Sequence, residues 1–440
     1  MMPTANQLNV NTGSAEEANK VRICVIGAGP AGLMTLRALQ SLDVNKFDVT
    51  CYERYAEVGG MWNFRPVEGL EEDGMERHST AYYGLVANSS KYFEECPEFP
   101  FHKYDASKDT GFECFPSWDD NVRYMNEFTD HFGIRKNIRF KSWIESVKFN
   151  SQAEKFDVKV KNLAEENGRD VLEVFDYVIV GTGHYHEPNY ITYPGQETFP
   201  GKILHAKYFH DAERYNGKRV LLVGSNFSAE DFACLLVKAQ AAKVTVSART
   251  QPIMIGLPKE VDLKRPVKNI EGTTINFEDG SYADYDIIIL CTGYLYHFPY
   301  LEESLRLKTK CKMAVPLYKQ VVFPKCPKLF YIGMQNVIYS FSMFWIQGHL
   351  CAHIINGMVE IPSLDEMEKD IKEAEEDEAK IDSLFGVVDF QTQYVQKLGD
   401  LLGKPNMGRN HIMWETIRVR DFDITKYKET TSIGALVGRL

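Results

Sequence analysis

The sequence has no excess of basic residues: 61 Asp and Glu outnumber 50 Lys and Arg, which gives a formal net charge of −11. Nucleic acid binding requires a basic face against the phosphates, so we expect no nucleic acid partner. The chain also has no run of the roughly 20 apolar residues that a membrane-spanning helix needs, so we expect no membrane anchor. Residues 1–20 lack the charged and then apolar layout of a signal peptide. We therefore expect a disordered N-terminal lead and a cytoplasmic protein.

Paired cysteines are missing as well. Nine cysteines are present, but no two are spaced as CxxC and none has the spacing of a metal site. We therefore expect free thiols and no bound metal. A reductase that passes electrons from a flavin to a disulfide normally uses a CxxC pair. Its absence argues against that class of enzyme.

A glycine-rich turn between a strand and a helix begins the ordered part of the chain. Residues 21–42, VRICVIGAGPAGLMTLRALQSL, contain an apolar strand, then Gly27, Gly29 and Gly32 as GxGxxG, then a helix with an apolar face. These glycines permit a tight turn, close approach of a pyrophosphate and packing of the helix on the strand. A second strand ends at Glu53, 26 residues after Gly27, where an acid binds ribose hydroxyls. A glycine-rich turn without a ligand is the alternative, but this context predicts a dinucleotide site, and the opposite charge at the second unit described next assigns the first unit to FAD.

A second unit of the same kind follows later in the chain. Its strand ends at Gly224, and Asn226 and Ala229 replace the second and third glycines, which the turn tolerates. The next strand ends in Arg249 instead of an acid, 25 residues after Gly224. A guanidinium neutralises the 2′-phosphate of NADPH, although Arg249 could also be a solvated charge at a strand end. The residues that we expect to contact NADPH are Gly224, Ser225, Asn226, Ser228, Arg249 and Thr250.

Two further strands, each followed by Thr-Gly and then by proline, enclose the second unit. They lie in FDYVIVGTGHYHEP and YDIIILCTGYLYHFP. The length of 440 residues suits two domains. We therefore expect an α/β fold with two dinucleotide-binding, Rossmann-like domains. Residues 1–20 would form the lead, 21–188 and 296–440 the FAD domain, and 189–295 an NADPH domain inserted into it.

The stretch that leads into the second unit has a specific pattern. Residues 199–209, FPGKILHAKYF, place Phe199, Gly201, His205 and Phe209 in the order FxGxxxHxxx(Y/F). With this pattern between two glycine-rich turns, the chain resembles the flavin-containing monooxygenases, a family of class B flavoprotein monooxygenases. It looks most similar to their soluble microbial branch, which includes trimethylamine monooxygenases. Nothing requires His205 to act as an acid or a base in catalysis. We therefore expect it to be a hydrogen-bonded core histidine that fixes the connection between the two units.

The resemblance also implies positions around the flavin. ERYAEVGGMWNF is similar to the family segment that lies along the flavin, GLVANSSKYF to the one with the active-site asparagine, and YIGMQ to one that approaches the flavin. These matches imply that Gly60, Met61, Trp62 and Gln335 contact the cofactor and that Asn88 is the catalytic residue.

Two departures from the microbial branch concern the substrate. Phe227 stands where that branch commonly has Tyr, and Trp345 where it commonly has Asp. We expect both residues, together with Tyr82, to line the substrate pocket. A large indole in place of a carboxylate would favour apolar or aromatic amines and sulfides over small cations, because a buried cation without a partner is costly.

The family implies a reaction in two halves. NADPH reduces FAD, the reduced flavin and dioxygen form a flavin hydroperoxide, and a soft nucleophile then attacks its distal oxygen. The expected products are N-oxides of amines and S-oxides of sulfides. An uncoupled NADPH oxidase and a Baeyer–Villiger monooxygenase of ketones are the alternatives, and the intact glycines, Glu53, Asn88 and Arg249 argue against a non-enzymatic module. Family members often form homodimers, so the resemblance implies a homodimer as one possible state of this chain.

Overall fold

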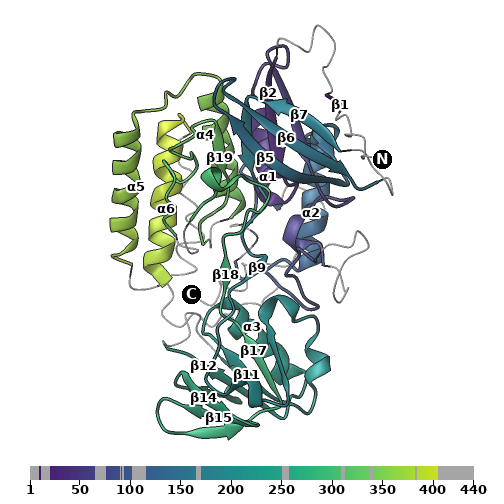
Figure 1. Cartoon of the computed structure of the whole chain (residues 1–440), viewed down its shortest axis with the longest axis vertical. Coiled ribbons are helices and arrows are strands. Elements are labelled where there is room, and N and C mark those ends of the chain that lie inside the picture. Colours follow the sequence, from purple (N-terminus) through teal and green to yellow (C-terminus); the bar gives the residue numbers. More distant parts are fainter. Residues whose placement is uncertain are drawn as a thin grey trace, which may run out of the picture.

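The computed structural model describes residues 9–10, 20–64, 76–89, 91, 94–101, 115–164, 170–249, 257–308, 313–336, 340–381 and 384–404. In this part of the chain a larger and a smaller α/β body lie one above the other, with two short strands between them (Figure 1). The arrangement confirms the expected mixed α/β class with two Rossmann-like sheets.

The larger body is built on a five-stranded parallel sheet with the order β19-β8-β2-β3-β4. Its strands are β2 (Val21–Ile26), β3 (Phe47–Tyr52), β4 (Ile138–Arg139), β8 (Tyr177–Val180) and β19 (Leu329–Tyr331). The apolar strand predicted before the first glycine turn is β2, at the centre of the sheet, where Ile23 and Val25 are fully buried. A parallel strand that is covered on both faces needs such a continuous apolar run.

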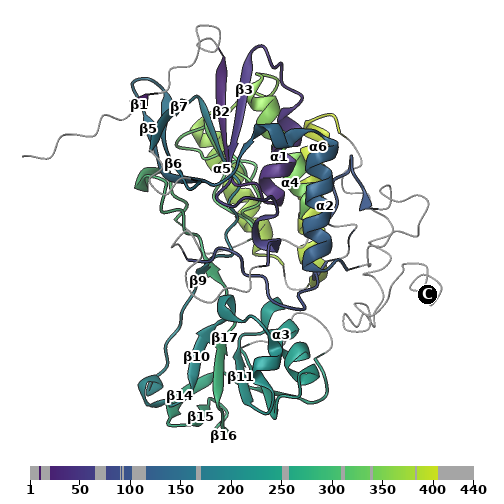
Figure 2. The same ribbon diagram turned by 90° about the vertical axis from the view of Figure 1, so that its right-hand side faces the viewer.

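Helices cover one face of this sheet (Figure 2). They are α1 (Pro30–Leu39), α2 (Trp118–His131), α4 (Phe341–Ile355) and α6 (Leu384–Leu401), and α5 (Leu364–Glu378) lies outside them. Ser117 begins α2, and Ser363 begins α5, with a capping box that an acid three residues later completes. Gly348 lets α4 lie close to α1, because a Cβ at this position would be 2.8 Å from the Cα of Thr35.

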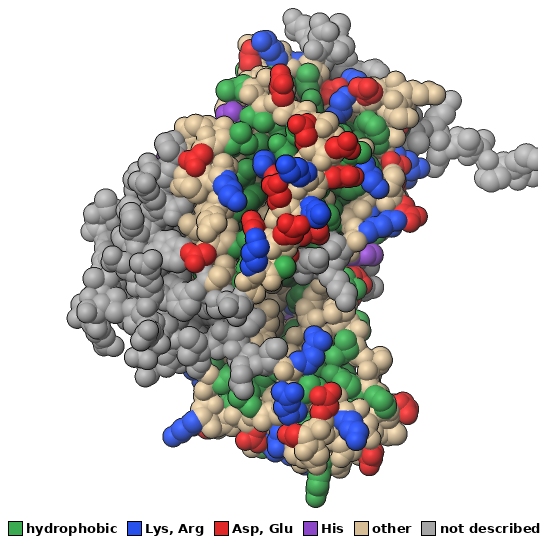
Figure 3. All heavy atoms as spheres, turned by 90° about the vertical axis from the view of Figure 1, so that its left-hand side faces the viewer, with side chains coloured by type: hydrophobic (Ala, Val, Ile, Leu, Met, Phe, Trp, Pro, Cys, Tyr) green, Lys and Arg blue, Asp and Glu red, His purple; other side chains and the backbone are tan. Residues whose placement is uncertain are grey.

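The acidic helix α5 lies on the outside of the larger body. Met367 is its one buried residue, and acidic and basic side chains alternate over this face (Figure 3). Lys369 and Lys372 each form an ion pair of 3.8 Å with the glutamate four residues later. Such exposed pairs contribute little to stability. The helix is a solvated face, as its composition predicts.

A mixed, mostly antiparallel sheet covers the other face of the larger body, where Phe156 and Val158 pack in one core with Cys24 of β2. Its order is β1-β7-β6-β5, with β1 (Asn9–Val10), β7 (Val171–Phe175), β6 (Lys155–Asn162) and β5 (Ser142–Asn150). We expected a disordered lead, but residues 9–10 pair in parallel with β7. A sheet edge offers unpaired backbone groups, which a short strand can bind whatever its side chains. The rest of 1–19 lies outside the described residues.

The smaller body has its own parallel sheet, with the order β10-β17-β11-β12-β13. Its strands are β10 (Lys202–His205), β11 (Arg219–Val223), β12 (Lys243–Ser247), β13 (Val261–Lys264) and β17 (Ile287–Leu290). Helix α3 (Phe227–Lys238) covers one face. The antiparallel strands β14 (Val267–Glu271), β15 (Thr274–Phe277) and β16 (Tyr282–Asp284) cover the other. All these elements fall in the chain between β8 and β19 of the larger body.

Two connections join the bodies. They contain β9 (Glu187–Pro188) and β18 (Tyr294–Leu295), which pair antiparallel with each other. His205 fixes this region: its Nε2 lies 2.9 Å from the carbonyl oxygen of Gly293, and its Nδ1 accepts a hydrogen bond of 3.1 Å from the backbone of Lys207. The imidazole is fully buried. His205 therefore has the structural role that we expected.

Candidate functional site

The first glycine-rich turn joins β2 to α1 and leaves no room for larger residues. Gly27 has a φ of +96°, and a Cβ there would lie 2.9 Å from the carbonyl oxygen of Gly181. A Cβ on Gly32 would lie 1.8 Å from the carbonyl oxygen of Gly27, so this glycine lets α1 pack on β2. Gly60 faces Gly29 so closely that a Cβ on Gly60 would lie 2.9 Å from the Cα of Gly29. Gly29 and Gly60 also line a cavity, which gives a phosphate access to the N-terminus of α1.

Glu53 lies beside this turn, at the end of β3. Its carboxylate accepts hydrogen bonds of 2.6 Å from the backbone of Ala28 and 2.8 Å from the backbone of Tyr55. Burial raises the pKa of Glu53, and the two backbone donors oppose that shift. The side chain also lines the cavity. The predicted acid is thus held in place next to the first turn, where ribose hydroxyls can reach it.

The second glycine-rich turn joins β11 to α3. Gly224 has a φ of +128°, and a Cβ there would lie 2.3 Å from a carbonyl oxygen just after β17. Asn226 caps the helix, and its Oδ1 accepts a hydrogen bond of 2.8 Å from the backbone of Phe227. Ser225 and Ser228 line the cavity on either side of the cap. The N-terminus of α3 therefore also faces the cavity, as a pyrophosphate site requires.

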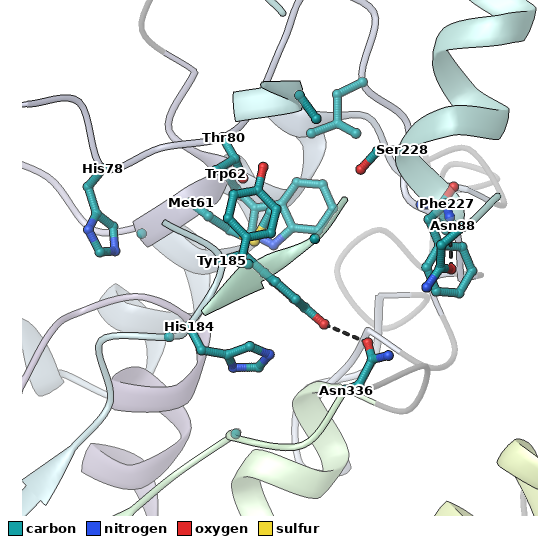
Figure 4. A pocket seen from close by; sticks show the side chains of 18 of the residues that line it. Met61, Trp62, His78, Thr80, Asn88, His184, Tyr185, Phe227, Ser228 and Asn336 are labelled. Atoms are coloured by element: carbon teal, nitrogen blue, oxygen red, sulfur yellow. Dashed lines mark hydrogen bonds between the residues drawn. The ribbon is translucent and has the colours of Figure 1, made fainter. Parts of the chain in front are cut away.

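Both turns open into one cavity of about 1150 Å³ between the two bodies. Figure 4 shows its centre, with Met61, Trp62 and Thr80 from the larger body and Phe227 and Ser228 from the smaller. Thr250 lies outside the described residues. The predicted site residues that the cavity brings together are Gly27, Gly29, Glu53, Gly60, Met61, Trp62, Tyr82, Asn88, Gly224, Ser225, Asn226, Phe227, Ser228 and Arg249.

Gln335 lies beside this cavity but is not one of its described lining residues. Its side chain is buried and accepts a hydrogen bond of 3.1 Å from Nε2 of Gln347 in α4. The next residue, Asn336, does line the cavity and accepts a hydrogen bond of 2.8 Å from the hydroxyl of Tyr185. The YIGMQ segment therefore approaches the cavity as the resemblance implies, but Asn336 supplies the side chain there.

Trp345 is the predicted residue that the structure places elsewhere. It belongs to α4, is buried, and is not among the described residues that line the cavity. Its Nε1 donates a hydrogen bond of 3.1 Å to Glu98, and its ring contacts His349 and the ammonium of Lys404. This position does not support the expectation that the indole shapes the substrate pocket, which stays a prediction. A helix that is buried almost all round gives no pattern from which the direction of one side chain can be predicted.

The cavity has polar lining residues that the sequence analysis did not single out, among them Tyr185, Asn336, His78 and His184. Burial lowers the pKa of His78 and of His184 from 6.5 to about 4, so both imidazoles are neutral at pH 7. His78 also stacks on His186 of the first connection, with 4.5 Å between the ring centroids. The two histidines and the tyrosine of TGHYHEP were the available signal. Their roles depend on the segment 76–89, which lies far away in sequence.

Tyr82 links the two bodies at the edge of the cavity. Its hydroxyl donates a hydrogen bond of 2.8 Å to Oδ2 of Asp231 in α3. Its ring packs edge-on against Phe209 and Phe232, with centroids 5.6 and 5.0 Å away. Phe209, the last residue of the FxGxxxHxxx(Y/F) pattern, stacks on Phe232 at 3.9 Å. The pattern therefore anchors helix α3 to the connection.

The residues present fit two bound dinucleotides. Pockets for single small molecules have volumes of roughly 300–1,000 Å³, and the cavity is larger, at about 1150 Å³. It has a close-packed glycine turn and an open helix N-terminus at each of its two sheets. Glu53 lies beside one turn and Arg249 follows the strand next to the other. These turns, helix N-termini and charged residues are therefore the ones that binding of FAD and NADPH requires.

Two dinucleotide sites that share one cavity define a flavoprotein oxidoreductase. The chain belongs to the flavin-binding monooxygenase-like family, whose model matches residues 20–260 and 251–414. It is therefore an enzyme, a flavin-dependent monooxygenase that uses FAD and NADPH. Among the described residues, every helix is too short or too polar to span a bilayer.

Individual relatives agree with this family. The trimethylamine monooxygenase of Methylocella silvestris is 34% identical over 426 residues, which cover 95% of this chain and 93% of that protein. The crystal structure of Tmm from Pelagibacter sp. strain HTCC7211 superposes with a TM-score of 0.84 at 31% identity, over 93% of each chain. The S-allyl-L-cysteine S-oxygenase of Allium sativum gives a TM-score of 0.80 at 26% identity, over 95% of this chain and 97% of that one.

Proposed function

We propose that this enzyme transfers one oxygen atom of dioxygen to the nitrogen of amines or the sulfur of sulfides. One observation carries the proposal: both glycine-rich turns open into the same cavity, so a hydride donor and a flavin can lie next to each other there. The relatives support the substrate classes, since one is named for trimethylamine and another for a sulfide, S-allyl-L-cysteine.

The proposal assigns the two bodies to two cofactors. Residues 21–188 and 296–440 would form the FAD domain and residues 189–295 the NADPH domain inserted into it. Glu53 beside the first turn and Arg249 beside the second support this assignment. An acid suits a free ribose hydroxyl, and a guanidinium suits a 2′-phosphate.

In the mechanism, bound FAD and NADPH supply the redox chemistry and the activation of dioxygen. The chain supplies binding and orientation. Gly29, Gly60 and the N-terminus of α1 would hold one pyrophosphate, and Ser225, Asn226 and the N-terminus of α3 the other.

The side chains around the reacting atoms contribute little acid–base chemistry. Asn88 offers a neutral amide that donates and accepts hydrogen bonds without exchanging a proton. His78 and His184 stay neutral at pH 7, because burial lowers the pKa of each to about 4. Phe227 and Phe344 line the cavity with apolar surface that excludes water. The site therefore suits oxygen transfer to a nucleophile that attacks by itself.

The test is a product balance. The purified enzyme should have the absorption spectrum of a flavin and should oxidise NADPH in air. We expect trimethylamine or a simple thioether to yield an N-oxide or S-oxide in near equality with the NADPH consumed. Hydrogen peroxide in place of product with every amine and sulfide would indicate an NADPH oxidase. Ester formation from a ketone would indicate a Baeyer–Villiger enzyme.

A homodimer stays a prediction. Light scattering of the holoenzyme measures it directly, and a mass of one chain would contradict it.

A further inference from the structure

Asn336 presents an unpaired amide nitrogen to the cavity. Its side chain is half-buried and lines the cavity. Its Oδ1 accepts the 2.8 Å hydrogen bond from the hydroxyl of Tyr185, whereas its Nδ2 has no hydrogen-bond partner in the described part of the chain. This nitrogen is not one of the sealed polar atoms of the interior, so a ligand can reach it. Figure 4 shows Oδ1 turned toward Tyr185 and the nitrogen on the side away from it.

Two helices hold the backbone on either side of this amide. The carbonyl oxygen of Asn336 accepts a hydrogen bond of 2.8 Å from Nε2 of Gln391 in α6. The backbone of Gly333 donates one of 2.9 Å to Oε1 of Gln347 in α4, and Nε2 of Gln347 donates one of 3.1 Å to Oε1 of Gln335. Gln347 is fully buried. The amide is therefore in position before a ligand arrives, and little ordering is required on binding.

Tyr185 fixes the direction of the amide from the other side. Its ring packs between two others, with centroids 4.1 Å from His184 and 5.7 Å from Tyr294 in β18. This packing holds the hydroxyl that donates to Oδ1 of Asn336. Because an amide group is planar, a bond that fixes Oδ1 also fixes the direction in which Nδ2 donates.

The wall around Asn336 is mostly apolar. Phe341 and Phe344 of α4 and Val388 of α6 line the cavity. Phe344 lies so close to the backbone of Gly333 that a Cβ there would be 2.5 Å from its ring. A donor in such a wall discriminates strongly, because a ligand without the matching acceptor leaves the buried amide unpaired.

The charges of the cavity decide which acceptor fits this donor. The charged side chains of the described lining are Glu53, Arg54, Glu94, Asp231, Arg249 and Glu278. Acids outnumber bases in this set, and the two arginines follow β3 and β12 beside the dinucleotide turns. A carboxylate at Asn336 would meet a neutral donor in an acidic cavity, which is unfavourable. An uncharged carbonyl oxygen accepts from the amide without that cost.

We propose that Asn336 determines specificity by donating a hydrogen bond from Nδ2 to an uncharged carbonyl oxygen of the substrate, and that Tyr185 is the positioning residue that keeps the amide in this orientation. The inference rests on the proposed function and narrows its substrate class. The carbonyl oxygen that binds Asn336 and the atom that is oxygenated are different atoms of one molecule. The substrate is then a sulfide or an amine that also carries an amide or another uncharged carbonyl group.

Three thioethers of similar shape test the proposal: (methylthio)propanamide, isopentyl methyl sulfide and (methylthio)propanoate. They share one nucleophilic sulfur and differ in the group at the other end of the chain, which is an amide, an alkyl group or a carboxylate. The measurement is kcat/KM for sulfoxide formation by the holoenzyme at pH 7. The ratio between the amide and the alkyl compound, compared between enzyme variants, cancels the reactivity of the sulfur itself.

Asn336→Leu keeps the approximate shape of the side chain and removes the donor. We expect it to lower the ratio between the amide and the alkyl compound by about 3-fold to 10-fold, the range of one uncharged hydrogen bond. The change should appear mainly in KM, because the bond is made equally in the ground state and the transition state. Tyr185→Phe keeps the ring and the donor but frees the amide to turn, so it should lower the same ratio by a smaller factor.

Asn137→Leu is the matched control. The amide of Asn137 donates a hydrogen bond of 3.0 Å to the carbonyl oxygen of Val49, and the residue is not among those that line the described cavity. This variant also loses a half-buried amide bond, so its stability should fall, but the ratio between the amide and the alkyl compound should stay at the wild-type value.

Two results would overturn the inference. One is an Asn336→Leu enzyme whose kcat/KM falls equally for the amide and the alkyl compound, which a purely structural role or a contact with NADPH predicts. The other is a larger loss for the propanoate than for the amide, which would assign Asn336 to an anionic group. Both results leave the proposed function intact, since sulfoxide still forms. If no thioether and no amine is oxygenated at all, the proposed function fails and the inference fails with it.

Discussion

The hydroxyl of Tyr82, in the larger body, donates a 2.8 Å hydrogen bond to Oδ2 of Asp231, in helix α3 of the smaller body. Burial is the main cause that raises the pKa of Tyr82, and the carboxylate of Asp231 raises it further, so the phenol stays protonated as a donor. The bond lies at the edge of the cavity and crosses between the two dinucleotide units. It is a direct side-chain link between them.

Tyr82→Phe should therefore weaken the contact between the bodies. We expect a loss of about 1 kcal/mol in the free energy of unfolding, the usual contribution of one hydrogen bond, measured by chemical denaturation. Tyr208→Phe is a matched control, because the hydroxyl of Tyr208 donates to the exposed Glu76. An equal loss in both variants would show that the Tyr82 bond has no special role.

Arg249→Ala should weaken NADPH binding selectively. A guanidinium can bind a 2′-phosphate with two hydrogen bonds, and charged hydrogen bonds of about 1.5–3 kcal/mol correspond to a roughly 10-fold to 100-fold change in affinity. We expect a higher KM for NADPH near the low end of that range, and a much smaller change for NADH. The measurement is flavin reduction as a function of cofactor concentration. Equal losses for both nucleotides would assign Arg249 to the fold.

Asn88→Ala should separate oxygen transfer from the reduction of the flavin. The amide lines the cavity, and its proposed task is to hold reacting atoms after hydride transfer. We expect the rate of flavin reduction by NADPH to stay within about 3-fold of wild type, and the products to shift from oxygenated substrate to hydrogen peroxide, because one lost hydrogen bond affects only the steps in which it is made. Wild-type coupling in this variant would remove Asn88 from the mechanism.

Trp345→Phe should affect stability and not substrate choice. The change removes the hydrogen bond from Nε1 to Glu98 and part of the contact with Lys404. We expect a loss of about 1 kcal/mol or more in the free energy of unfolding. The relative kcat/KM values of neutral and cationic thioethers should not change. Phe344→Leu is the comparison, since Phe344 of the same helix lines the cavity. A changed preference in the Trp345 variant would place the indole in the substrate pocket after all.

The buried His205 should make the fold sensitive to acid. Burial lowers the pKa of His205 from 6.5 to about 4. Between these two values the unfolded chain binds a proton that the folded enzyme does not bind. The free energy of unfolding therefore falls as the pH drops from about 6.5 towards 4, by at most about 1.4 kcal/mol per pH unit for one such group.

His205→Gln removes this titration. We expect its stability at pH 7 to be lower than that of wild type, because the imidazole bonds to Gly293 and Lys207 are disturbed. Its loss of stability between pH 6.5 and 4.5 should be shallower. Denaturation curves at several pH values measure the free energy of unfolding of both proteins. The contributions of the other buried groups are the same in both and cancel in the difference. Parallel pH profiles would show that His205 is not the group responsible.

The residue order by itself determined the two dinucleotide units. Backbone strain and close packing leave glycine as the residue that fits at Gly27 and Gly224, and strand, turn and helix follow one another within about 25 residues. Such local patterns are readable because the physical constraint acts on neighbours in the chain. For the same reason, the charge that follows each second strand, Glu53 or Arg249, could be assigned from spacing alone.

Only the tertiary structure decided which other side chains meet in the cavity. Glu94 was not singled out from the sequence, and its position depends on hydrogen bonds from Ser89 and from Asn121 of α2. Trp345 belongs to a helix that is buried almost all round, so its direction depends on packing against Glu98 and Lys404 and not on periodicity. Contacts between residues far apart in the chain decide both cases, because burial and charge pairing act through space and leave no local pattern.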